Sequence, residues 1–145
     1  MAAGPLRLRA EDAEDLGVLA AAVQDALFVV GDLRFDARER RFIATVNRFR
    51  WETARKRGPY ERVRAALCVE TALSVKSRKL RLGADEATGS LLDVGFSPGE
   101  APGGTVLLRL AGGGEIAVEV ECIEVTLTDV GAPWPTAHRP DHEKA

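Results

Sequence analysis

The feature that most constrains the fold is a long alternation of side chains in the middle of the chain. At every second position from residue 63 to residue 75 the side chain is aliphatic or small. The opposite face carries Arg62, Arg64, Cys68, Glu70, Ser74 and Lys76. Successive side chains of a β-strand point to opposite faces of a sheet, so this period of two predicts a strand with one buried face. The alternation is longer than an ordinary strand, which predicts a bend or a bulge near Glu70 and Thr71.

Other segments also have the character of strands. We expect strands at residues 6–9, 33–35, 42–51, 91–96, 105–110 and 115–122. The strands 33–35 and 42–51 are expected to form one hairpin, and the strands 105–110 and 115–122 a second. The polar stretch 36–39 and the Gly-rich stretch 111–114 are expected to be the two hairpin turns. Beyond Cys122 the apolar positions shift by one residue, which predicts another bulge or a new strand.

One amphipathic helix is predicted near the N-terminus. Its apolar residues recur at the spacing of one helical face: Leu16, Leu19, Ala20, Val23 and Leu27. The acidic residues within 11–15 favour the positive end of the helix dipole, and Asp12 is suited to cap the first turn. Gly31 and Asp32 indicate a turn that closes this region.

Together these elements predict an α+β fold, with one N-terminal helix packed on a twisted, mostly antiparallel sheet of six or more strands. Whether that sheet is only twisted or is partly rolled into a barrel stays open. All 145 residues are expected to form a single domain, in which residues 131–145 are an extended Pro-rich tail, frayed at its end. Apolar residues make up 46% and charged residues 29% of the chain, which is typical of a globular protein.

A cytoplasmic location is expected. The longest uncharged apolar stretch, residues 16–24, is too short to span a membrane, and residues 1–5 lack the pattern of a secretory signal. Cys68 and Cys122 do not form a Cys-x-x-Cys pair, and both lie in apolar strand patterns. We therefore expect two buried free thiols, with a disulfide or a reactive thiol as the alternative.

Charge is distributed unevenly along the chain, although the formal net charge is only −2. Residues 1–33 contain two basic and six acidic residues, residues 34–81 contain fifteen and five, and residues 82–145 contain three and eleven. The middle segment is therefore strongly cationic within an acidic chain. The overall pI of about 5.8 argues against a dedicated nucleic-acid-binding protein.

The cationic segment is open to two interpretations. Its run 48–51 alternates arginines and aromatic rings, which single-stranded nucleic acid binding uses for phosphate contact and base stacking. Alternatively, basic and acidic strand faces pair within one sheet. That pairing would set Arg62, Arg64 and Lys76 opposite Glu115, Glu119 and Glu121.

We favour a non-catalytic binding or interaction module over nucleic-acid binding and over an enzyme without a recognisable motif. The partner is expected to be a protein or an acidic ligand, with nucleic acid less favoured and no membrane. The candidate surface consists of Arg48, Phe49, Arg50, Trp51, Arg55, Lys56, Arg57 and Trp134. If these residues form an exposed surface, charge reversal at Arg48 and Arg50 should leave the melting temperature nearly unchanged.

The tail combines stiffness with a large ring. Pro133 and Pro135 fix an extended backbone around Trp134, which either covers a hydrophobic gap or forms a ridge for a partner.

No catalytic, cofactor or metal site is expected. Residues 111–114 lack the Lys-Ser/Thr that follows a phosphate-binding loop. His138 and His142 have the i, i+4 spacing of metal ligands on a helix, but Pro140 lies between them, so we expect a solvated tail.

Segments spread over nearly the whole chain carry a family resemblance: residues 6–8, residues 30–32 with Phe35, residues 47–52 and residues 131–136. The last two segments, Asn-Arg-Phe-Arg-Trp-Glu and Gly-Ala-Pro-Trp-Pro-Thr, are the most specific. On these segments the chain resembles a bacterial family known as domain of unknown function 2948. The resemblance implies a free-standing bacterial cytosolic protein and carries over no catalytic or binding residue.

Overall fold

The computed structural model describes residues 4–54 and 59–140. Within these residues it contains one helix, two short 3-10 turns (η) and eleven strands. In chain order the elements are β1 (Arg7–Ala10), α1 (Ala13–Val23), β2 (Ala26–Val29), η1 (Val30–Asp32), β3 (Leu33–Asp36), β4 (Arg41–Phe49), η2 (Trp51–Thr53), β5 (Tyr60–Val69), β6 (Ala72–Arg78), β7 (Thr88–Pro98), β8 (Gly104–Leu110), β9 (Glu115–Val120), β10 (Val125–Asp129) and β11 (Trp134–Thr136).

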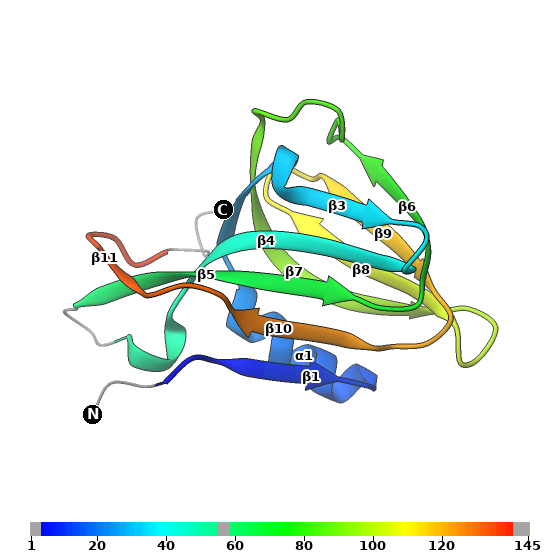
Figure 1. Cartoon of the computed structure of the whole chain (residues 1–145), viewed down its shortest axis with the longest axis horizontal. Coiled ribbons are helices and arrows are strands. Elements are labelled where there is room, and N and C mark those ends of the chain that lie inside the picture. The colour runs from blue at the N-terminus through cyan, green and yellow to red at the C-terminus, as the bar shows by residue number, and fades with distance from the viewer. Residues whose placement is uncertain (1–3, 55–58, 141–145) are drawn as a thin grey trace.

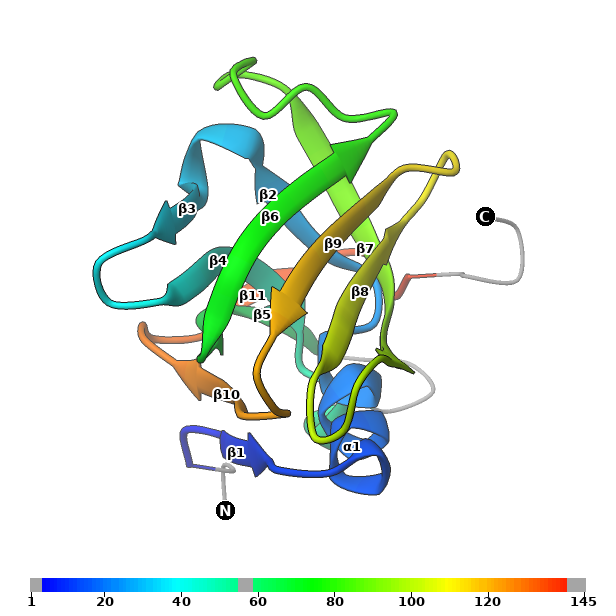
Figure 2. The same ribbon diagram turned by 90° about the vertical axis from the view of Figure 1, so that its right-hand side faces the viewer.

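The strands form one curled antiparallel sheet (Figures 1 and 2). Its order is β1-β10-β5-β4-β2-β7-β8-β9-β6, with β3 added to β4 and β11 added to β5. The edge strands β1 and β6 do not pair with each other, so the sheet is not closed into a barrel. The predicted α+β class, with one helix on a large antiparallel sheet, is confirmed.

The core lies on the inner, concave face of the sheet. On β4 the inner residues Phe42, Ala44 and Val46 are each at most 2% exposed, and the odd-numbered residues of β5 from Val63 to Val69 continue the same layer. The buried side of α1 supplies Leu16, Leu19, Ala20 and Val23. The helix packs mainly against β7 and β1 and lies at one end of the curled sheet (Figure 2). Burying a side chain such as Leu16 contributes roughly 1.5–3 kcal/mol, and this packing holds the helix in place.

The helix begins as predicted and ends earlier. Asp12 caps it, because its Oδ1 accepts a hydrogen bond of 2.8 Å from the backbone N–H of Asp15. The chain then turns at Asp25, which has a left-handed φ of 63°, and enters β2. Leu27, expected on the buried side of the helix, therefore lies on β2 and is 45% exposed.

The predicted bend after residue 69 is present and is sharper than expected. Thr71 has a φ of 54° and separates β5 from β6, which lie in different parts of the sheet. The turn shifts the alternation by one residue, so that Ala72 is buried and Leu73 is 45% exposed. The expectation that one buried face continues to Leu73 is thus wrong.

Both predicted hairpins are present. The turn between β8 and β9 uses positive φ angles of 88° and 93° at Gly112 and Gly113, which glycine adopts without steric cost. The first hairpin joins β3 and β4, and β4 ends at Phe49 because Trp51 begins η2.

The predicted pairing of basic with acidic strands is correct only for β6 and β9. Arg78 on β6 lies 3.4 Å from Glu115 on β9. Arg62 and Arg64 belong to β5, which pairs with β4, β10 and β11, so they do not lie across from the acidic residues of β9.

Two glycine-to-alanine substitutions should have opposite effects on stability. A Cβ at Gly89 would overlap the ring of Phe28, so Gly89→Ala should destabilise the protein by about 1–3 kcal/mol. Gly17 lies inside α1 with open space around it, so Gly17→Ala should stabilise by roughly 0.5–1 kcal/mol. Urea unfolding of both variants checks the pair, and equal effects would contradict the packing of Phe28 on Gly89.

Candidate functional site

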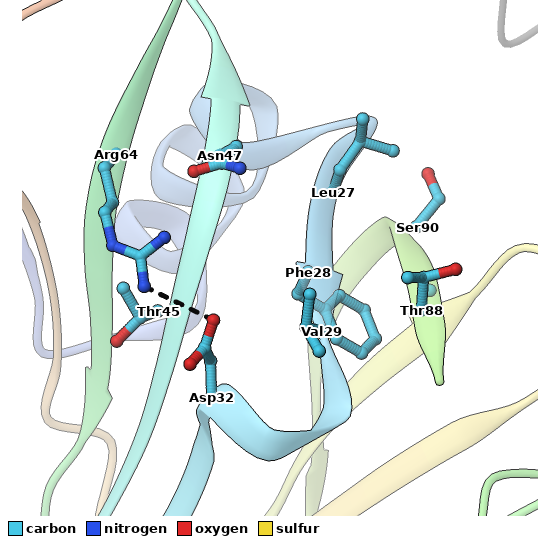
Figure 3. Close-up of a pocket in the computed structure, with 10 residues that line it drawn as sticks. Leu27, Phe28, Val29, Asp32, Thr45, Asn47, Arg64, Thr88 and Ser90 are labelled. Atoms are coloured by element: carbon cyan, nitrogen blue, oxygen red, sulfur yellow. Dashed lines mark hydrogen bonds and ion pairs between the residues drawn. The ribbon is translucent and has the colours of Figure 1, made fainter. Parts of the chain in front are cut away.

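A groove on the outer face of the sheet is the best candidate for a binding site (Figure 3). Its volume is about 490 Å³, and it spans the surface from β4 and β5 across β2 to β7. The residues that line it are Leu27, Phe28, Val29, Asp32, Thr45, Asn47, Arg64, Thr88, Gly89 and Ser90. A volume of this size is within the usual range for small-molecule sites.

The groove exists because β2 leaves β4 soon after meeting it. The two strands share a single residue pair, Leu27 opposite Asn47, while β2 pairs with β7 along its whole length. Beyond β2 the chain enters η1, where the N–H of Val30 donates to the carbonyl of Ala87 at 2.7 Å. Gly31 approaches the next loop so closely that a Cβ would lie 3.0 Å from the carbonyl oxygen of Asp85. These contacts hold η1 beside residues 85–87.

The groove has an apolar floor and rim. Strand alternation turns Ala26 and Phe28 inward, so Leu27 and Val29 point outward and are 45% and 38% exposed. Figure 3 shows both side chains between β4 on one side and Thr88 and Ser90 on the other.

Polar groups line the wall of the groove that is formed by η1, β4 and β5. Arg64 Nη2 contacts Asp32 Oδ2 at 3.3 Å, so the two formal charges there offset each other. The Oδ1 atom of Asn47 is buried and has no hydrogen-bond partner among the described residues. A buried polar atom without a partner costs about 1–3 kcal/mol. Figure 3 shows the Asn47 nitrogen pointing toward β2 and the oxygen toward β5.

This set of side chains suits binding better than acid–base catalysis. The groove residues in the described part of the chain include one carboxylate, Asp32, and no histidine or cysteine. General acid–base chemistry usually needs two titratable groups at the reacting atoms. Among the described residues, no group of three or more His, Cys, Asp or Glu side chains could hold a metal ion. Of the two histidines with metal-ligand spacing, His138 belongs to the described residues and His142 lies outside them.

The described residues of the sequence-predicted surface do not line the groove. Arg48 and Phe49 are fully buried and Arg50 is 3% exposed, so these three side chains do not form an exposed surface. Trp51 is half-buried, and Trp134 is 38% exposed. Arg55, Lys56 and Arg57 lie outside the described residues.

Arg48 is buried because strand alternation puts it on the inner face, after Phe42, Ala44 and Val46. It lies opposite Val63 of β5, and Asp129 of β10 lies opposite Ala65 on the other side of β5. The two side chains therefore meet across β5, with Nε–Oδ1 and Nη2–Oδ2 distances of 2.8 Å each.

Glu52 on η2 makes the second carboxylate contact of Arg48. Its two oxygens accept from Nη1 at 2.9 Å and from Nη2 at 2.6 Å. Arg50 in turn pairs with Glu61 at 2.6 Å. The charges of Arg48 and Arg50, which were expected to face a partner, therefore pair with carboxylates inside the protein.

This network shifts the pKa values of its members. Burial alone would raise the pKa of Asp129, but hydrogen bonds from Arg48 and from the Leu6 amide outweigh it, so the pKa lies below its ordinary value of 3.8. Burial likewise opposes the shift at Glu52, yet its pKa is held below 4.5, mainly by the hydrogen bonds and charge of Arg48. The pKa of Arg48 is raised, because the same carboxylates more than offset its desolvation.

Phe49 faces the outer side of the sheet, under a cover of rings and cations. Trp51 packs edge-on against it at 4.6 Å between centroids, Tyr60 lies at 5.8 Å, and Arg62 lies 5.9 Å from its centroid. Trp51 donates through Nε1 to the carbonyl of Gln24 at 3.0 Å, and Arg139 lies 5.6 Å from its ring centroid. The rings expected to stack on bases are thus largely packed within the protein.

The tail joins the sheet as β11. Trp134 lies opposite Arg62, and Thr136 opposite Tyr60. Residues 134–136 of the tail therefore form a strand on β5, with Trp134 partly exposed. The last residues of the tail, 141–145, lie outside the described residues.

The groove was not found from the sequence. Its main signal is the alternation in residues 26–29, which the preceding helix pattern obscures. Two apolar residues of this short segment point outward, and only knowledge of neighbouring β4 and β7 would show that they line a groove.

Comparison with known proteins gives a match to a protein family. A family model described as Protein of unknown function (DUF2948) matches residues 6–142. No curated protein and no solved structure matches the chain.

Removing Asp129 should destabilise the protein strongly. Asp129→Ala leaves the Arg48 guanidinium buried without one of its two carboxylates, which should cost about 3–5 kcal/mol. Arg9→Ala removes a cation that is 61% exposed and should cost less than about 1 kcal/mol. Urea unfolding compares the two, and a cost for Asp129→Ala no larger than for Arg9→Ala would contradict a structural role.

Stability should also fall in acid because of this network. Since the pKa values of Asp129 and Glu52 are lowered on folding, their contribution is complete above about pH 5 and is lost as pH falls through the folded values. The variant Asp129→Asn should therefore show a flatter dependence of unfolding free energy on pH below about 5. Parallel curves for the variant and the wild-type protein would show that Asp129 does not carry this dependence.

Proposed function

Because the chain belongs to the family described as Protein of unknown function (DUF2948), we propose its function from its own geometry. We propose that the whole chain is one non-catalytic binding domain whose ligand occupies the outer groove. The ligand is a small, mainly apolar molecule without net charge that carries an N–H or O–H group.

The observation that carries the proposal is the buried Asn47 carboxamide oxygen, which has no partner among the described residues. Asn47 lines the same groove as the exposed Leu27 and Val29, and in Figure 3 its amide nitrogen points toward β2 and its oxygen toward β5. Ligand sites typically combine apolar walls with a few placed polar groups. Rotation of the Asn47 carboxamide would turn its oxygen toward β2, where a donor on the ligand would satisfy it. The apolar body of the ligand would then cover Leu27 and Val29.

The charge of the ligand follows from Arg64 and Asp32. Because these two side chains already pair at 3.3 Å, a charged ligand would have to compete with one of them for the other. A ligand without net charge leaves this pair intact.

Nucleic-acid binding through residues 34–81 has less support. Phe49 is fully buried, and the ring of Trp51 packs against Phe49 and lies near Arg139. Base stacking needs accessible ring faces. This segment therefore has fewer accessible rings than the alternation of Arg and aromatic residues led us to expect.

A cytoplasmic location is part of the proposal. Cys68 and Cys122 are free thiols, and burial raises the pKa of the Cys68 thiol, which keeps it protonated and unreactive. Among the described residues, no helix has the length and apolar character needed to cross a membrane.

Titration with short N-alkyl amides, followed by NMR of the labelled protein, tests the groove. Binding should be weak, with Kd on the order of 1 mM, and should shift resonances of Leu27, Thr45 and Asn47. Leu27→Glu should weaken it at least about tenfold, because the variant introduces a charge into an apolar rim. Val18→Glu changes another exposed apolar residue, on α1, and should have no effect. Shifts that arise elsewhere, or that persist in Leu27→Glu, would overturn the proposal.

A further inference from the structure

The sheet has an open seam between β3 and β6. Within the described residues, β3 pairs only with β4, and β6 pairs only with β9. The start of β6 meets the turn between β3 and β4, where the N–H of Ala72 donates to the carbonyl of Arg40 at 2.9 Å. At the opposite end of the sheet, α1 packs against the edge strand β1.

Inner-face side chains along the seam are incompletely covered. Phe35 on β3 lies opposite Phe42, and directly opposed residues of antiparallel strands share a face. Phe42 is 1% exposed, whereas Phe35 is 40% exposed. On β6, Val75 lies opposite the fully buried Val118 but is itself only half-buried. The core layer is therefore open to solvent along this seam.

Cations flank the seam on the outer face. Arg34 lies opposite Ile43 on β3, and Lys76 lies opposite Ala117 on β6. Both are exposed and lack an ion pair in the part of the chain that the structure describes, as do the neighbouring cations Arg38, Lys79 and Arg81. Acidic residues also occur here. Glu115 and Glu119 on β9 lie diagonally from Lys76, and others lie at the β3–β4 turn (Asp36 and Glu39) and in the loop before β7 (Asp85 and Glu86).

We propose that the seam binds an extended segment of a partner protein in which apolar and acidic residues alternate. The segment adds as a strand to the free edge of β6, a recognition mode in which backbone hydrogen bonds supply affinity and alternate side chains supply specificity. Its apolar side chains cover Phe35 and Val75. Its acidic side chains lie on the outer face between Arg34 and Lys76.

Charged residues on an edge strand also serve to prevent unwanted pairing. That role accounts for Lys76 on β6. It does not account for Phe35, because an aromatic ring on the inner face beside an open edge favours association.

Fluorescence anisotropy with a labelled peptide of alternating Val and Glu residues tests the proposal, with a Val/Lys peptide as the charge-reversed probe. The Val/Glu peptide should bind at low salt, and the Val/Lys peptide should not. The double variant Arg34→Glu/Lys76→Glu should bind the Val/Glu peptide at least about tenfold more weakly. The matched control Arg7→Glu/Arg109→Glu changes the net charge equally at exposed residues of β1 and β8, and should bind within about twofold of wild type.

Hydrogen exchange separates strand addition from simple charge attraction. Bound peptide should slow the exchange of β6 amides, and Phe35→Ser should weaken binding with little change in melting temperature because the ring is 40% exposed. The groove variant Leu27→Glu should bind the peptide normally, so failure of the groove and failure of the seam are distinguishable. No binding by the wild-type protein at low salt, equal binding of both peptides, equal losses in both double variants or unprotected β6 amides would each overturn the proposal.

Discussion

The ion pair between Arg48 and Asp129 is the constraint on which this end of the molecule depends. Both side chains lie on the inner face of the sheet, where removing a charge from water is costly unless geometry and further hydrogen bonds compensate. The compensation comes from different parts of the chain. Glu52 completes the contacts of Arg48, and the backbone of Leu6 donates to Asp129 at 2.8 Å. One guanidinium therefore fixes four segments relative to one another: the end of β4, the turn η2, the end of β10 and the segment before β1.

This pairing changes the meaning of the uneven charge along the chain. Within the described residues, much of the cationic middle segment is matched with carboxylates: Arg40 with Glu121, Arg41 with Glu70, Arg48 with Asp129, Arg50 with Glu61, Arg64 with Asp32 and Arg78 with Glu115. Most of these carboxylates lie far from their arginines in sequence. Four of these six pairs join the cationic segment to acidic residues outside it, so part of the charge separation in sequence is compensated in the fold. The cations left without such a partner include those beside the β3–β6 seam.

The sequence predicts much of the fold and little of the site. The period of two predicts both hairpins and the strands other than β2 and β11, and Asp12 marks the start of the helix, because these signals are local. The same alternation in residues 42–48 puts Arg48 on the face of Phe42, Ala44 and Val46, so its burial was accessible to sequence reasoning. Its partner Asp129 was not accessible in this way. Asp129 follows Val125 and Leu127 on an inner face, but nothing local shows that β10 lies two strands away from β4.

The groove and the seam have a common structural origin in residues 26–36. In this segment β2 pairs with β7, η1 turns the chain beside residues 85–87, and β3 pairs with β4 alone. The groove opens where β2 leaves β4, and the seam opens where β3 finds no second neighbour among the described strands. A sheet that closed fully would lack the seam. Each unpaired edge costs the domain some backbone hydrogen bonding, and here these openings leave Leu27 and Val29 exposed at the groove and Phe35 exposed at the seam.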